Sequence, residues 1–174
     1  KIAVLSEETC APLGAATGFF LFFHEQYFLV TAWHVVSGRH FQTKEPLHHS
    51  LALPGTIECS YSIIRSISAE GEFEVAPNVG HFSIDVSGDW LSGNHSIHPD
   101  FGSDVDVVAI NVTQNVKEAL PHGFDFCCFK SEDVAVGEAV AVMDQVFIPG
   151  YPDLRVQPPN RGPIYKSCFI STEP

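Results

Sequence analysis

The sequence predicts an all-β fold, and three observations support that prediction. Short runs of β-branched and aromatic residues recur along the chain, Gly, Pro, Asn and Asp separate these runs, and a helical period is almost absent. With 174 residues, of which 45% are hydrophobic, the chain is long enough for one globular domain or two small lobes that share a core. A β-sandwich or β-barrel is therefore expected.

The strand pattern is clearest near the N-terminal end. Residues 18–23 and 27–32 are predicted to form a hairpin, with His24-Glu25-Gln26 as the connection, and "AWHVV" is predicted to form a short helical turn after it. The only other helical signal, at 116–120, is enough for a turn or two. The remaining expected strands are 50–53, 58–67, 73–75, 105–112, 139–147 and 164–170.

Two segments interrupt this pattern. Residues 68–101 are rich in Gly, Asn, Ser and His, with Trp90 as an isolated aromatic, and are expected to form loops on the rim of a barrel. Residues 121–137 join an earlier set of strands to a later one. The predicted organisation is therefore a first lobe at 1–120, a connection at 121–137 and the start of a second lobe at 138–174.

Composition and charge argue against several classes of function. Nine basic residues against 21 acidic ones give a formal net charge of −12, and the basic residues are scattered, so neither nucleic acid nor an anionic membrane is an expected partner. No apolar run is long enough to span a bilayer, and no signal peptide is present. Five cysteines without C-x-x-C spacing argue against a zinc ribbon or a disulfide framework and favour a reducing, cytoplasmic compartment.

Nine histidines raise the alternative of a metal site, above all at His48-His49 and at His95-x-x-His98 followed by Asp100. Ligands three residues apart can chelate a metal on a helix or a tight loop. This segment has neither a helical period nor an adjacent cysteine, so a solvated loop is the preferred interpretation. We expect no metal and no cofactor.

The residues that point to catalysis are His34 and Asp106. His34 follows the second hairpin strand, so a rigid sheet would hold its imidazole, as a general base requires. Such a base needs a partner that sets its tautomer, and Asp106 precedes the apolar run "VVAI". A carboxylate at the start of a buried strand requires a partner of its own. Asp104, two residues earlier, is the alternative to Asp106.

These motifs resemble the trypsin/chymotrypsin-like serine peptidases. "TGFFLFF…YFLVTAWHVVSG" is similar to that family's T-A-x-H motif, "DVVAI" to its aspartate motif, and "AVMDQVFIPGYPD" to the opening of its second barrel. The resemblance implies a double six-stranded antiparallel β-barrel, a polypeptide substrate, His34 as the general base and Asp106 as the residue that orients it. It gives no indication of the oligomeric state.

The family's Gly-x-Ser-Gly-Gly segment does not occur in the sequence, and Ser167 in "YKSCFI" is predicted to lie in a strand. The resemblance therefore implies that the second barrel is incomplete here and that the nucleophile lies outside this chain. A fragment of an active serine endopeptidase is the first interpretation. The alternative is a catalytically inactive two-barrel protein that acts as a binding module.

Overall fold

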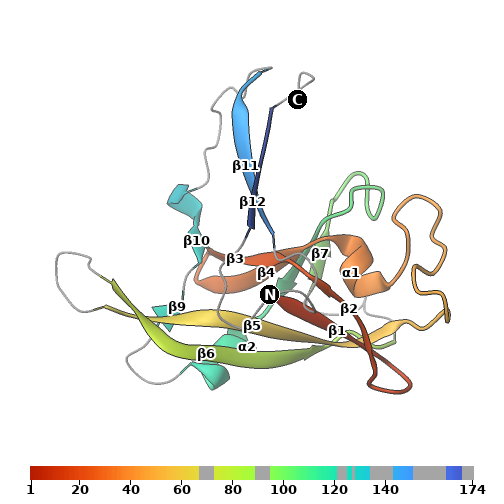
Figure 1. Ribbon diagram of the computed structural model, residues 1–174, viewed down its shortest axis with the longest axis horizontal. Helices are drawn as coiled ribbons and strands as arrows, with labels where there is room; N and C mark the ends of the chain where they lie inside the picture. Colours follow the sequence, from red (N-terminus) through yellow and green to blue (C-terminus); the bar gives the residue numbers. More distant parts are fainter. Residues whose placement is uncertain are drawn as a thin grey trace. The chain divides into compact units, whose positions relative to one another are not determined.

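The computed structural model describes residues 1–66, 73–88, 95–120, 125–126, 128–133, 143–150 and 164–169 (Figure 1). The chain divides into two compact units, Lys1–Ser131 and Glu132–Pro174. Strands dominate both units, and all of the strand pairs except one are antiparallel in the described part of the chain. The all-β prediction is therefore confirmed.

The first unit contains two five-stranded sheets. One sheet has the order β2-β1-β5-β6, with β9 also paired to β5. Its strands are β1 (Ile2–Ser6), β2 (Pro12–Ala16), β5 (Pro54–Ser66), β6 (Phe73–Asp85) and β9 (Asp125–Phe126).

The other sheet has the order β10-β3-β4-β8-β7. The pair β10–β3 is parallel, and the remaining pairs are antiparallel. Its strands are β3 (Gly18–Phe23), β4 (Gln26–Thr31), β7 (His95–Ile97), β8 (Val108–Asn111) and β10 (Phe129–Lys130).

The core of the first unit lies between these two sheets, which Figure 1 shows one above the other. Alternate residues of β5 are buried, as the two-residue period of a strand requires. Aromatic rings join the layers: the ring centroid of Phe20 on β3 lies 4.9 Å from that of Phe126 on β9 and 6.1 Å from that of Tyr61 on β5. Strand pairing closes neither sheet into a barrel in the described residues, so the trypsin-like double barrel stays a prediction.

The predicted hairpin is confirmed, because β3 and β4 pair from Gly18↔Thr31 to Phe23↔Gln26. Its turn residues His24 and Glu25 both have positive φ, 47° and 61°. That pattern is typical of the type I′ turn, whose twist matches that of a two-residue hairpin.

The predicted helical turn is also confirmed. Helix α1 (Trp33–Ser37) follows β4 and ends at Gly38, whose φ of 65° is left-handed. A Cβ at Gly38 would lie 2.4 Å from Cδ of Pro54, so a glycine is required at this helix end. The second helix, α2 (Thr113–Ala119), is longer than the 116–120 turn that the sequence predicts.

Some of the strand and loop predictions were wrong. Residues 50–53 form a turn and coil, where Leu51 has a φ of 61°. Residues 105–107 precede β8 instead of belonging to it. Residues 73–85, expected largely as loops, form the long strand β6 because they pair with β5 along nearly its whole length. The alternating "HFSIDV", with Phe82 and Ile84 turned toward the core and His81 and Ser83 exposed, was the missed signal.

The second unit contains a two-stranded antiparallel sheet of β11 (Gln145–Gly150) and β12 (Ile164–Phe169), with the 3₁₀ turn η2 (Ser131–Asp133) at the junction between the units. Ser167 lies within β12, as predicted.

Residues 139–142, Trp90 and Cys127 lie outside the described residues. In the described part of the chain, no helix is long and apolar enough to cross a membrane.

Candidate catalytic site

His34 lies in the first turn of α1, immediately after the hairpin. Trp33, Val35 and Val36 are buried and anchor the helix on the core. The intervening His34 side chain is 42% exposed. The short helix therefore holds the imidazole at the surface on a backbone that buried neighbours keep in place.

Asp106 contacts His34 through both of its carboxylate oxygens. Oδ1 accepts a hydrogen bond from the backbone N–H of His34 at 2.9 Å, and Oδ2 lies 2.6 Å from the ring nitrogen Nδ1. A carboxylate can only accept, so the proton of this second bond belongs to Nδ1. The neutral imidazole then has its lone pair on Nε2, which has no hydrogen-bond partner among the described residues.

The structure places Asp106, and not Asp104, against the histidine. The Asp104 side chain is 79% exposed, and its carboxylate lies 3.3 Å from Nζ of Lys44. The sequence places the two aspartates two residues apart, but they do not share one face of a strand, because the chain turns at 103–105 before β8 begins. Asp106 reaches His34 from an irregular segment that only the fold brings to α1.

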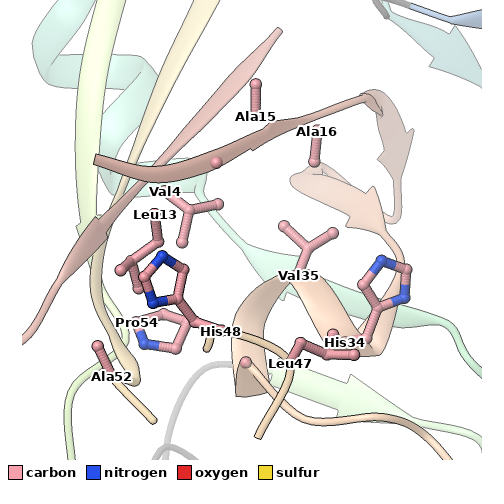
Figure 2. Close-up of a pocket in the computed structure, with 12 residues that line it drawn as sticks. Val4, Leu13, Ala15, Ala16, His34, Val35, Leu47, His48, Ala52 and Pro54 are labelled. Atoms are coloured by element: carbon pink, nitrogen blue, oxygen red, sulfur yellow. The ribbon is translucent and has the colours of Figure 1, made fainter. Parts of the chain in front are cut away.

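Two surface depressions flank His34, with Leu47 on the wall of both. The first, of about 210 Å³, is lined mainly by small and apolar residues of β2, α1 and the segment after it. In the view of Figure 2 the His34 and His48 imidazoles lie on opposite sides of Val35. The second, of about 240 Å³, includes Asp106, His40 and Phe41. The imidazole is thus accessible to a molecule that lies along this surface.

The alternative of a metal site finds no geometric support in the described residues, where no three His, Cys, Asp or Glu side chains are placed to hold a metal ion. His48 Nδ1 lies 2.7 Å from the hydroxyl of Ser50. His98 Nδ1 accepts backbone N–H groups of its own loop. These imidazoles organise turns within the described segments.

Sequence reasoning missed the residues that surround this pair. Lys44, Leu47 and the aromatic pair His40 and Phe41 lie in the segment after α1, where the sequence has no strand or helix period. No motif links them to His34. They lie there because the chain after α1 folds back beside His34 and Asp106.

Comparisons with models of known protein families, with curated proteins and with solved structures found no significant match.

Proposed function

We propose that this chain is the His- and Asp-bearing part of a trypsin-like serine endopeptidase. The observation that carries the proposal is the two-point contact of Asp106 with the backbone and the ring of His34. A carboxylate held in this way sets both the tautomer and the orientation of the imidazole, which is the role of the aspartate in a Ser-His-Asp triad. The motif resemblance of both residues agrees with it.

The exposure of the pair also favours a functional role. The side chains of His34 and Asp106 are 42% and 26% exposed, respectively. Ion pairs at such solvated positions contribute only about 0–1 kcal/mol to stability. Stability alone is therefore a weak reason for the His34 ring and the Asp106 carboxylate to be held at 2.6 Å.

The proposed reaction is acyl transfer from a peptide bond. Nε2 of His34 takes the proton of a serine hydroxyl as its oxygen bonds to the carbonyl carbon, and Asp106 stabilises the resulting imidazolium. The imidazolium then returns that proton to the leaving amine nitrogen as the C–N bond breaks. Water hydrolyses the acyl-enzyme by the same route. We assign no nucleophile among the 174 residues.

A fluorophosphonate probe tests the proposal on the natural protein, including any sequence that flanks these residues. Mass spectrometry of the intact protein should show a single adduct on the wild type and none on His34→Ala. The matched control is His81→Ala, an exposed histidine on β6 of the other sheet, which should label like the wild type.

The absence of any adduct on folded wild-type protein would contradict the peptidase proposal. The alternative, an inactive two-barrel binding module, would then be preferred. Labelling that persists in His34→Ala would also contradict the proposal, because the reactive group would not depend on the assigned base.

A further inference from the structure

In the described residues, few hydrogen bonds tie the segment that carries Asp106, residues 103–107, to other parts of the chain. The backbone hydrogen bonds of residues 103–107 join residues of this segment to each other or to the neighbouring Phe101. In the part of the chain that the structure describes, the hydrogen bonds that reach farther go to His34 and Lys44. Strand β8 continues directly from this segment, and in the described chain Lys44 is the residue besides His34 that bonds to the segment from elsewhere.

The Lys44 ammonium joins two loops. Its three N–H donors are shared among four acceptors, of which three lie on the Asp106 side: the hydroxyl of Ser103 at 2.7 Å, its carbonyl at 3.2 Å and the Asp104 carboxylate at 3.3 Å. On its own loop, it donates to the carbonyl of Phe41. The same ammonium lies 4.9 Å from the ring centroid of Trp33, the residue before His34. One charge thus contacts the loop before Asp106 and the helix that carries His34.

The loop that presents Lys44 is braced internally. Arg39 and Pro46 form a β-bridge at its base, and the backbone N–H of His40 donates to Glu45 at 2.8 Å. The Arg39 side chain donates to the carbonyl of Lys44 at 3.1 Å. Lys44 has a φ of 61°, a left-handed conformation that a non-glycine residue keeps only where its surroundings impose it. Its ammonium is therefore presented by a preorganised loop.

The contacts of Lys44 differ in strength. Its pair with Asp104 is solvated, because the two side chains are 41% and 79% exposed, so it contributes little. Charge-assisted hydrogen bonds to neutral acceptors are stronger, and of those that reach the 103–107 segment the shorter one goes to the Ser103 hydroxyl. Ser103 is therefore the main anchor of the link.

We propose that Lys44 is a positioning residue, which holds the 103–107 segment so that Asp106 meets both the backbone N–H and the ring of His34. The proposal rests on the proposed function, since it concerns the orientation of the assigned base. Lys44 affects His34 through Asp106. Its bond goes to Ser103, three residues before Asp106, although Lys44 itself lies 62 residues before Asp106 in the chain.

The test measures solvent exchange of the His34 Nδ1 proton by NMR, with the resonance assigned by its loss in His34→Gln. Lys44→Met keeps an apolar stem over Trp33 and removes every donor. It should speed the exchange about tenfold, the effect of losing a charged hydrogen bond. Lys44→Arg should restore much of the protection, because a guanidinium keeps the charge and the donors.

The matched control is Lys117→Met on α2, where an exposed lysine makes no hydrogen bond or ion pair in the described residues. It should leave the exchange unchanged. Wild-type exchange in folded Lys44→Met would overturn the proposal. If Lys44→Met does not fold, Ser103→Ala replaces it by removing only the 2.7 Å acceptor, and wild-type exchange in that variant would overturn the proposal as well.

This experiment needs no nucleophile, so it separates the two proposals. Faster exchange in Lys44→Met with no fluorophosphonate adduct on the wild type would support the positioning role and contradict the peptidase. Adduct formation on the wild type with unchanged exchange in Lys44→Met would support the peptidase and contradict the positioning role.

Discussion

At the scale of single residues, the candidate site consists of one imidazole and one carboxylate whose geometry distinguishes them from their neighbours. Both carboxylate oxygens of Asp106 bond to His34, whereas the carboxylate of the nearby Asp104 contacts Lys44 at the surface. The bond to the backbone N–H orients the carboxylate, and the bond from the ring then orients the imidazole against it. The difference between the two aspartates is therefore one of orientation and not of charge.

Replacing Asp106 with Asn should impair the proposed reaction far more than replacing Asp104. An amide can donate toward Nδ1 and so favour the wrong tautomer, and in the Ser-His-Asp triad of serine peptidases this change lowers kcat by about 10⁴-fold. We expect a loss of about 10³-fold or more in the fluorophosphonate labelling rate for Asp106→Asn, and at most about twofold for Asp104→Asn. Equal losses in the two variants would contradict the assignment of Asp106.

Cys59 should make the stability of the protein depend on alkaline pH. Burial in the core raises the pKa of the Cys59 thiol from 9.0 to about 12. Between these values the unfolded thiol has lost its proton and the folded thiol keeps it, so the unfolded state binds fewer protons and the free energy of unfolding falls as pH rises.

The full effect of one such group is about 1.4 kcal/mol per pH unit. Urea unfolding between pH 8 and pH 11 should therefore show a steeper loss of stability in the wild type than in Cys59→Val, which has no thiol. Parallel pH profiles for the two proteins would rule out this role of Cys59.

At the scale of elements, the position of His34 depends on a hairpin, a five-residue helix and the end of that helix. The hairpin delivers the chain to α1 after the buried Thr31, whose hydroxyl donates to the carbonyl of Thr17 at 3.0 Å. Gly38 then ends the helix, where its backbone N–H donates to the carbonyl of His34. A helix this short has little stability of its own, so tertiary contacts hold it.

Gly38→Ala should destabilise the protein and loosen the site. The left-handed backbone is unfavourable for alanine, and the new Cβ would overlap Cδ of Pro54, for a combined cost of about 2–4 kcal/mol. Chemical denaturation measures this cost. Gly14→Ala on β2 is the control, because its added Cβ would meet nothing within 4 Å. Similar stability of the two variants would contradict the argument.

At the scale of the whole molecule, the first unit is held together by a core shared between its two sheets. Phe126 is 2% exposed, and its ring packs against those of Phe20, Tyr27 and Tyr61. It belongs to β9, which extends the sheet of β5. A residue from the segment expected to connect two lobes is thus part of the first unit's core.

Phe126→Ala should therefore cost about 3–5 kcal/mol of unfolding free energy, as expected for the loss of a buried aromatic ring. Phe129→Ala, three residues later, removes a ring that is 53% exposed and contacts Phe19 alone among the described aromatic rings. It should cost about 1 kcal/mol. Chemical denaturation of both variants measures the two costs in unfolding free energy. A small cost for Phe126→Ala would mean that the β9 segment does not stabilise the unit.

The sequence by itself determined the all-β class, the hairpin and the turn that carries His34, and it pointed to Asp106 with Asp104 as the alternative. These features depend on local patterns: a two-residue period, turn residues and a short motif. It did not predict β1, β2 and β7, the full length of β6, or that Asp106 approaches His34 from irregular backbone.

Tertiary structure decided these points because each depends on contacts between residues far apart in the chain. Residues 73–85 form a strand along their whole length because β5 supplies hydrogen-bond partners, and this pairing outweighs the weak local strand propensity of the segment. Asp106, and not Asp104, meets His34 because the chain turns before β8 and because Lys44 holds that turn from another loop. Sequence patterns report the periods of strands and helices, and they do not report which loops meet.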